Sequence, residues 1–296
     1  MKNLTLKQLR YVDALARHSH FGRAAAACSV SQPALSVQIR ELETTLGTLL
    51  FERGGRQVRL TRFGETFAER VSSILFAIDE LGELARASGE VLDGELRLGV
   101  IPTIAPYLLP RVLGGLSYAF PDLDLRVRET ITPRLLDELN TGRLDAAIVA
   151  LPVSEPELAE LALLEEPMLL VRHKSQAGSP APSVNALGEH RLLLLEEGHC
   201  FRDQALAFCE LGNGSVREGL EGTSLSTLVQ MVGAGMGVTL IPAMAAEVET
   251  RAASITVDRF ADPQPSRTVG IVWRRSTPLA GRLTEFAEYL RGCLGA

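Results

Sequence analysis

The feature that most constrains the fold is a change in hydrophobic periodicity near residue 90. Between Leu6 and Ala87 apolar residues recur at intervals of three and four, which predicts helices, whereas from Glu95 onward short apolar strands alternate with helical segments. A chain of 296 residues is also too long for one ordinary core, since domains most often hold about 100 to 150 residues. We therefore predict a helical N-terminal module and a larger α/β region, with a short hinge at Gly89 to Gly94.

The two regions also differ in charge. Residues 1–65 contain ten Lys or Arg and five Asp or Glu, so they carry +5, whereas the whole chain carries -6. This asymmetry favours a DNA-contacting module attached to an acidic region, although a solvated surface gives the same balance. With 46% hydrophobic residues the chain is expected to fold, and its short apolar stretches and charged N-terminus predict a cytoplasmic protein with no membrane segment.

Three helices are expected in the basic module. They cover Leu6 to His18, Phe21 to Cys28, and a segment that begins after Ser31, a good N-cap residue. The buried stripe of the third helix consists of Leu35, Ile39, Leu42 and Leu46. Its opposite arc carries short side chains and one guanidinium, from Pro33, Ser36, Val37 and Arg40. Short side chains let a helix approach base edges, so this arc suits a major groove.

A hairpin should follow the third helix, because Gly54 and Gly55 separate two alternating segments. Helical spacing alone would favour a small packing module. However, the run that contains Ser31-Gln32-Pro33-Ala34-Leu35-Ser36 and Leu50-Phe51-Glu52-Arg53 closely resembles the winged helix-turn-helix of LysR-type transcriptional regulators. The resemblance implies double-stranded DNA as a partner. It places four residues on the DNA-reading helix and two on a wing that contacts the DNA backbone: Gln32, Pro33, Ser36 and Arg40, then Arg53 and Arg56.

A long helix is predicted from Thr61 to about Ala87. Its apolar residues alternate at spacings of four and three, as in a coiled coil: Phe67, Val71, Ile74, Ile78, Leu81 and Ala85. The stripe could pack on its own chain, but LysR-like proteins pair through this helix. We therefore expect a homodimer through the linker helix and a homotetramer of two such dimers, with RNA polymerase as a further partner.

From Glu95 onward the order of strands and helices predicts a right-handed, mainly parallel α/β sheet, with a second unit beginning near Pro167. One more strand, Arg267 to Arg274, should cross back into the first unit. The glycines of Gly233-Ala234-Gly235-Met236-Gly237 follow a helix and precede a strand, the reverse of a phosphate-binding loop, so they predict a helix end and a turn.

This region resembles the two-lobed effector domain of the LysR family, which is similar to periplasmic binding proteins. The predicted fold class is therefore α/β with an N-terminal winged helix-turn-helix, a long linker helix and a two-lobed effector domain. The predicted divisions are 1–62 for DNA binding, 63–92 for the linker and dimerisation helix, 93–165 with 268–296 for effector lobe I, and 166–267 for effector lobe II, the redox-sensing lobe. Ligands in such folds lie between the lobes, so a regulator that binds a small metabolite there is one hypothesis.

Cys200 is the most informative single residue. Gly198 ends a strand and the residues after Cys200 favour a helix, so the thiol should lie at a helix N-terminus beside His199 and Arg202. Partial positive charge at a helix end and nearby cationic groups favour the thiolate, the nucleophile of thiol redox chemistry. A small apolar residue at a helix start is the alternative for a lone cysteine.

Cys209 makes the redox hypothesis stronger. Nine residues of continuous helix give about 13.5 Å of rise, whereas a disulfide needs Cα atoms within about 7 Å. Cys200 and Cys209 therefore cannot bond while the helix is intact. If they form a redox pair, closing the disulfide must unwind the helix, which would convert oxidation into a conformational change.

The string Gly198-His199-Cys200, followed by Arg202-Asp203-Gln204 and Cys209, resembles the sensing segment of the hydrogen-peroxide sensors within the LysR family. The resemblance implies that Cys200 is the peroxidatic cysteine and Cys209 the resolving one, with hydrogen peroxide as the signal. Four further residues match polar groups that hold peroxide near the thiolate or line its pocket: Thr103, Thr132, His199 and Arg267. The chain would then be a regulator and not an enzyme; a thiol peroxidase is the rival from another class.

The other cysteines, Cys28 and Cys293, are expected to be buried apolar residues or bystanders. The cysteine and histidine spacing contains no paired C-x-x-C and only five scattered histidines, so we expect no metal site and no cofactor.

Overall fold

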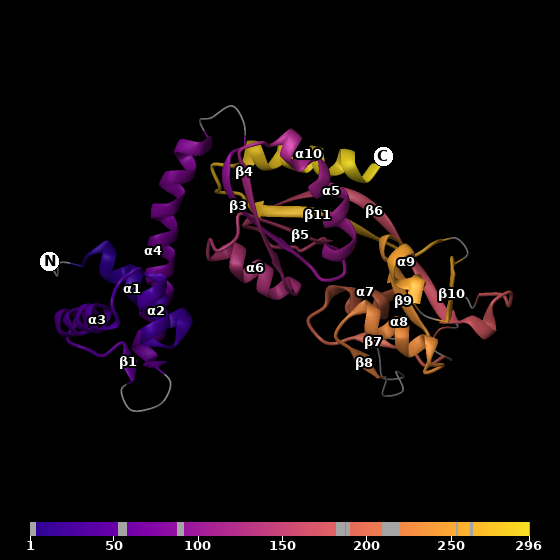
Figure 1. The fold of residues 1–296 in the computed structure, drawn as a ribbon, viewed down its shortest axis with the longest axis horizontal. Helices are drawn as coiled ribbons and strands as arrows, with labels where there is room; N and C mark the ends of the chain where they lie inside the picture. The colour runs from indigo at the N-terminus through magenta and orange to yellow at the C-terminus, as the bar shows by residue number, and fades with distance from the viewer. Residues whose placement is uncertain are drawn as a thin grey trace. The chain divides into compact units, whose positions relative to one another are not determined.

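The computed structural model describes residues 4–52, 58–87, 92–181, 187, 190–208, 220–252, 254–260 and 263–295. The chain forms two compact units, Met1–Ala85 and Arg86–Ala296 (Figure 1). No helix in the described part of the chain is long and apolar enough to span a bilayer.

The first unit is a three-helix module with a short hairpin and a long final helix. Its elements are α1 (Leu6–His18), α2 (Phe21–Ala27), α3 (Gln32–Leu46), β1 (Phe51–Glu52), β2 (Arg59–Leu60) and α4 (Arg62–Ala87). Local sequence explains the helix ends. The Ser31 hydroxyl accepts a hydrogen bond from the Ala34 amide at 3.3 Å and begins α3, and Gly47 ends it at a positive φ of 77°.

The core of this unit confirms the buried stripe of α3, because Leu35, Ile39 and Leu42 are at most 2% exposed. A buried carboxylate, Glu43, attaches the hairpin to α3 by accepting hydrogen bonds from two backbone amides, those of Leu50 and Phe51, at 2.9 and 3.2 Å. These bonds hold the hairpin at a constant position against the helix, as a wing requires.

The second unit contains the α/β region. Its elements are β3 (Gly94–Val100), α5 (Ala105–Ala119), β4 (Leu123–Glu129), α6 (Thr132–Asn140), β5 (Ala146–Leu151), β6 (Leu158–His173), the 3-10 turn η1 (Lys174–Gln176), β7 (Leu194–Leu195), α7 (Cys200–Phe208), β8 (Glu221–Gly222), α8 (Leu225–Gly233), β9 (Thr239–Pro242), α9 (Ala243–Glu249), the 3-10 turn η3 (Thr250–Ala252), β10 (Ile255–Asp258), β11 (Ser266–Arg274) and α10 (Ala280–Gly295). In Figure 1, α10 and α6 lie on opposite sides of strands β5 and β11.

The prediction of a mainly parallel sheet is confirmed for β3, β4 and β5 but is wrong for the main sheet as a whole. Strands in the main sheet follow the order β10-β6-β11-β5-β3-β4, with β9 also pairing with β6. Only the pairs that β3 makes with β4 and with β5 are parallel in this sheet, whereas β11 and β6 run antiparallel to their neighbours. The prediction failed for β6 and β11 because their apolar runs look alike in either direction, and pairing direction depends on segments far apart in the chain.

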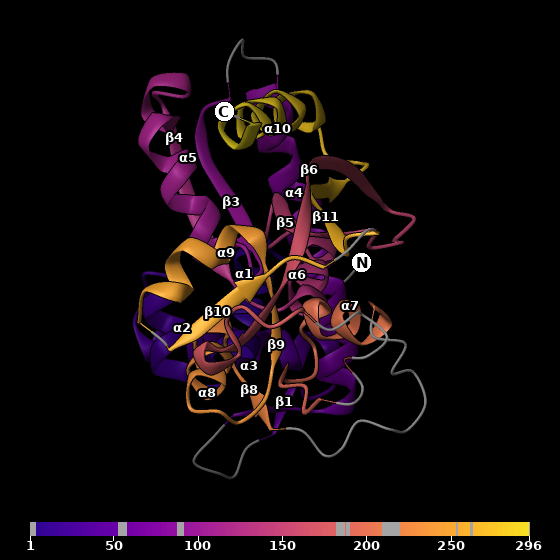
Figure 2. The same ribbon diagram turned by 90° about the vertical axis from the view of Figure 1, so that its right-hand side faces the viewer.

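Strand β6 is a single 16-residue strand that belongs to both lobes. Up to Pro167 it pairs with β11, and from Met168 it pairs with β9. The pairing of β11 with β5 confirms the predicted return of this strand to the lobe that contains β3, β4 and β5. The lobes are therefore joined by two adjacent strands, β6 and β11 (Figure 2).

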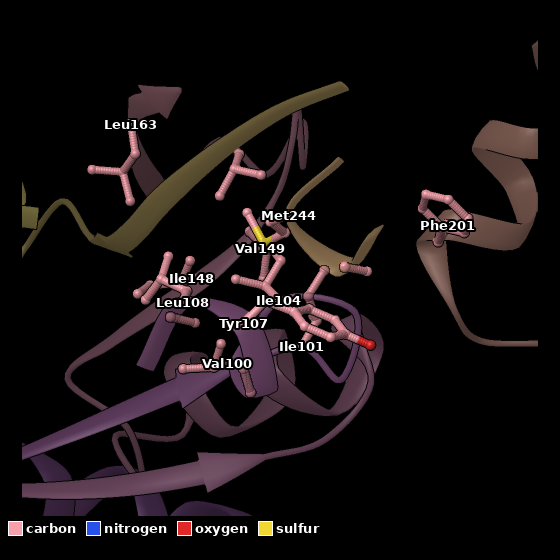
Figure 3. Close-up of a cluster of buried hydrophobic side chains, with 14 of the residues drawn as sticks. Val100, Ile101, Ile104, Tyr107, Leu108, Ile148, Val149, Leu163, Phe201 and Met244 are labelled. Carbon is pink, nitrogen blue, oxygen red and sulfur yellow. The ribbon is translucent and has the colours of Figure 1, made fainter. Parts of the chain in front are cut away.

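A continuous apolar core fills this unit. Ile148 of β5 lies beside Leu108 of α5, and Val149 of β5 lies beside Met244 of α9 (Figure 3). Tyr107 borders the same cluster with its hydroxyl directed away from it (Figure 3). That hydroxyl donates to Glu249 Oε1 at 2.8 Å, and burial together with this hydrogen bond raises the pKa of Tyr107. The phenol therefore keeps its proton and links α5 to the end of α9.

Candidate functional site

Cys200 is the first residue of α7, as the sequence predicted, and its side chain is half-buried. Gly198 explains how the segment before it approaches the first lobe. Its φ is 91°, a backbone conformation that residues other than glycine rarely adopt, and a Cβ atom at this position would lie 2.9 Å from Ile131 Cδ1. A glycine at this position therefore lets His199 and Cys200 pack closely against the start of α6.

A pocket around Cys200 brings together segments from both lobes. Its lining residues are Ile101, Pro102, Thr103, Ile131, Thr132, His199, Cys200 and Phe201. Three predicted site residues, Thr103, Thr132 and His199, thus lie with the thiol in one place. The side chains around this pocket pack closely together.

The hydroxyl of Thr132 is the unusual polar group of this pocket. Thr132 begins α6, and its Oγ1 is buried without a hydrogen-bond partner among the described residues. An unpaired buried hydroxyl is unfavourable, typically by about 1 to 3 kcal/mol. Such a group is poised to bond to a polar guest that enters the pocket.

Arg267 does not line the pocket directly, but it holds one of the lining residues. Its side chain is fully buried. Nη1 donates to Thr103 Oγ1 at 2.9 Å and Nη2 donates to the Thr103 carbonyl at 3.1 Å. Its guanidinium carbon also lies 5.2 Å from the centre of the Phe201 ring. Arg267 therefore contacts residues on both walls of the pocket.

The expected cationic surroundings of the thiol are corrected by the structure. Burial lowers the pKa of His199, against a smaller opposing effect of Glu196, so the imidazole is neutral at neutral pH. Arg202 donates to the Leu195 carbonyl at 2.8 Å and to Glu221 Oε1 at 2.6 Å, and Glu221 balances its charge. The N-terminal end of α7 remains as the source of positive potential beside Cys200.

The remaining cysteines differ in how far they can be placed. Cys209 lies outside the described residues, since α7 is described to Phe208. Cys28 packs against the core of the first unit. Burial, and to a smaller extent the negative charge of Asp13, raise the pKa of its thiol. Cys293 packs against the core of the second unit. Among the described residues no group of His, Cys, Asp or Glu could hold a metal ion.

The predicted DNA-reading arc is on the outside of α3. Gln32, Pro33 and Arg40 are exposed and Ser36 is half-buried. Arg40 lies along the helix, where its Nε donates to the Ser36 carbonyl at 3.3 Å. Arg53 and Arg56 of the predicted wing lie outside the described residues.

The apolar stripe predicted on α4 divides into two parts. Phe67 and Val71 pack into the core of their own unit, so they are not available to a partner helix. Ile74 and Leu81 are 47% and 65% exposed. Leu84, which the prediction omitted, is 55% exposed. Beyond the part of the helix that packs on its own unit, the exposed apolar side chains are therefore Ile74, Leu81 and Leu84, and Phe63 at the start of the helix is also 46% exposed.

Family models account for nearly the whole chain. Residues 6–65 match the bacterial regulatory helix-turn-helix protein of the lysR family, and residues 89–294 match the LysR substrate binding domain. The chain belongs to the LysR family of bacterial transcriptional regulators. Within that family it is similar to the DNA-binding transcriptional dual regulator OxyR of Escherichia coli K12, with 40% identity over 291 residues that cover 97% of this chain and 95% of the relative.

Further relatives and solved structures carry the same designation. A probable hydrogen peroxide-inducible genes activator of Streptomyces viridosporus is 45% identical over 97% of this chain and 93% of the relative. A full-length OxyR variant from Pseudomonas aeruginosa matches with a TM-score of 0.78 at 38% identity, covering 98% of this chain and 95% of that chain. A hydrogen peroxide-bound OxyR mutant from Corynebacterium glutamicum matches with a TM-score of 0.68 at 35% identity, covering 99% and 93%.

Proposed function

We propose that this protein is a transcriptional regulator that senses hydrogen peroxide through Cys200. The observation that carries the proposal is the pocket, in which a thiol at a helix N-terminus lies with Thr103, His199 and the unpaired hydroxyl of Thr132. The names of the relatives, several of which are called activators of hydrogen peroxide-inducible genes, support the same function. In this assignment the protein acts as a regulator and not as an enzyme.

The chemistry needs only groups of this chain and peroxide. The Cys200 thiolate attacks one peroxide oxygen, an S–O bond forms, the O–O bond breaks, and the departing hydroxide takes a proton to become water. Hydroxyls of Thr103 and Thr132 orient the peroxide and stabilise charge on the leaving oxygen, while the neutral His199 imidazole offers a further hydrogen-bonding group. Arg267 supports this arrangement through Thr103.

Cys209 is proposed as the resolving cysteine. Its thiol attacks the sulfenic sulfur of Cys200, an S–S bond forms, and the S–O bond breaks with release of water, so two thiols together supply the two electrons that reduce peroxide. Continuous helix would separate these residues by about 13.5 Å. The disulfide therefore requires α7 to unwind, which couples oxidation to a change in shape.

The other functional assignments complete the proposal. Residues 1–62 bind DNA through Gln32, Pro33, Ser36 and Arg40, with Arg53 and Arg56 on the DNA backbone. Segment 63–92 pairs two chains through the exposed side chains of Ile74, Leu81 and Leu84. Residues 93–165 with 268–296 form the first effector lobe and 166–267 the second. Two dimers form a homotetramer, and RNA polymerase is the downstream partner.

The test is brief exposure of the full chain to peroxide, followed by peptide mapping of disulfides and hydrogen exchange. The expected product is a Cys200–Cys209 disulfide with faster exchange in residues 201–208. A disulfide formed with unchanged exchange in that segment would show that the two cysteines were adjacent before oxidation. An intact transcriptional response after replacement of both cysteines would instead indicate a metabolite signal.

A further inference from the structure

Glu166 is a buried acid that neither the motifs nor the proposed chemistry uses. It is 1% exposed and lies on β6 next to Pro167, where that strand changes partners from β11 to β9. Its cross-strand partner is Arg267. The pair therefore lies at the place where β6 and β11 pass from one lobe to the other.

Both carboxylate oxygens of Glu166 are engaged. Oε2 accepts hydrogen bonds from Arg267 Nε at 2.9 Å and lies 2.8 Å from Arg267 Nη2. Oε1 accepts from the Met244 amide at 2.8 Å, in the first turn of α9. A two-pronged contact of this kind sets the plane of a guanidinium, because its donors form a rigid fork.

The rest of that guanidinium faces the pocket wall. Arginine carries donors only, so Thr103 Oγ1 must accept from Nη1, and the Thr103 hydroxyl hydrogen is left to point elsewhere. The same guanidinium lies against the Phe201 ring, which adjoins Cys200 in sequence. The position of Arg267 therefore affects both a hydroxyl donor and the aromatic wall beside the thiol.

We propose that Glu166 is a positioning residue for the reaction of Cys200 with peroxide. It acts through Arg267, whose plane it sets, and so keeps the Thr103 hydroxyl directed toward a guest in the pocket. This inference rests on the proposed function, since it assigns Glu166 a part in the same reaction. A structural role alone would alter stability without selecting between one reagent and another.

The experiment compares two reagents at Cys200 in the full chain, with rates followed by mass spectrometry of the Cys200 peptide. Peroxide needs an oriented hydroxyl, whereas iodoacetamide needs only an accessible thiolate. In Glu166→Gln we expect the peroxide rate constant to fall by about 10-fold to 100-fold, as misplaced reacting groups commonly cause, with the iodoacetamide rate unchanged. The matched control is Glu165→Gln, which changes the neighbouring exposed acid that accepts from Ser266 and should leave both rates unchanged.

A double-mutant cycle tests whether Glu166 acts through Arg267. Arg267→Met should slow the peroxide reaction, and adding Glu166→Gln to it should cause no further loss. Additive losses, or a parallel fall in both rate constants of Glu166→Gln, would overturn the inference. If Glu166→Gln loses its folded circular dichroism spectrum, Glu166→Asp replaces it with the same outcomes, because it keeps the charge and shortens the reach.

Failure of this inference can be told from failure of the proposed function. A wild-type Cys200 that reacts with peroxide no faster than free cysteine would overturn both. A fast wild type matched by an equally fast Glu166→Gln would overturn the role of Glu166 alone.

Discussion

The DNA-reading surface and the cysteine pocket are assembled in different ways. On α3 the proposed contact residues Gln32 to Arg40 lie on one helix and face outward, over a separate buried stripe. Around Cys200 the proposed groups come from segments as distant as Thr103 and Arg267, and several of them are buried. Binding and folding can therefore be changed independently on α3, whereas in the pocket a change in chemistry also changes packing.

Cys200→Ser should have the largest effect, a complete loss of the peroxide response. Serine keeps the size of the side chain, so fold and DNA binding should persist while oxidation stops. Measurements are thiol alkylation and reporter transcription before and after peroxide. Cys293→Ser, at a core position of the second unit, is the control and should respond normally. A peroxide response that survives in Cys200→Ser would show that the pocket around Cys200 is not the peroxide sensor.

Ile74→Glu should convert the dimer to monomers. The residue is 47% exposed on α4, and pairing would bring two carboxylates into an apolar contact. Sedimentation measures the change, and Ser73→Glu provides a control at the adjacent exposed position. An unchanged dimer in Ile74→Glu would show that the dimer contact lies elsewhere than on α4, and would contradict the proposal that segment 63–92 pairs two chains.

Leu42→Ala and Arg40→Ala test whether binding and folding separate on α3. Leu42 is fully buried, so its truncation should destabilise the first unit by about 2 to 5 kcal/mol through a cavity. Arg40 is exposed, so its loss should weaken DNA binding and reduce its salt dependence with little change in stability. Hydrogen exchange in α1 and α3 measures the first effect and footprinting over a salt series measures the second. Equal destabilisation by both would contradict the separation.

Tyr107→Phe should have the smallest effect of this series. It removes the hydrogen bond between Tyr107 and Glu249, which links α5 to α9, and should lower stability of the second unit by about 1 to 3 kcal/mol. Thermal unfolding followed by near-ultraviolet circular dichroism is the measurement. Tyr118→Phe, at a side chain 89% exposed, should leave the transition in place. No difference between the two variants would show that this contact between lobes is energetically silent.

Helices were the most predictable part of the fold. The predicted bounds of α1 match the structure, and Ser31 and Thr61 precede α3 and α4 as expected. Helix α9 and strand β10, which are 7 and 4 residues long, were not predicted. The part of the long strand β6 before Pro167 was not predicted, since the second unit was expected to begin near Pro167 and exposed acids interrupt the earlier part of the strand.

Within the candidate site, the sequence predicted the residues to which we assign chemistry but not Glu166, the buried acid that we propose positions them. Glu166 directly precedes the apolar run of β6 from Pro167 to Val171, and a carboxylate that is buried there needs a partner. The identity of that partner could not be found from spacing, because Arg267 is 101 residues away.

The sequence by itself determined the local features of this protein: helix ends, the buried stripe of α3, a thiol at the start of α7, and membership of the LysR family by motif. These depend on neighbours within a few residues, whose relative positions follow from helix geometry. Only the tertiary structure decided strand direction, the crossing of β6 between lobes, the compensation of Arg202 by Glu221, and the meeting of Thr103, Arg267 and Glu166. Those features depend on contacts between distant segments, and local periodicity carries no information about which segments meet.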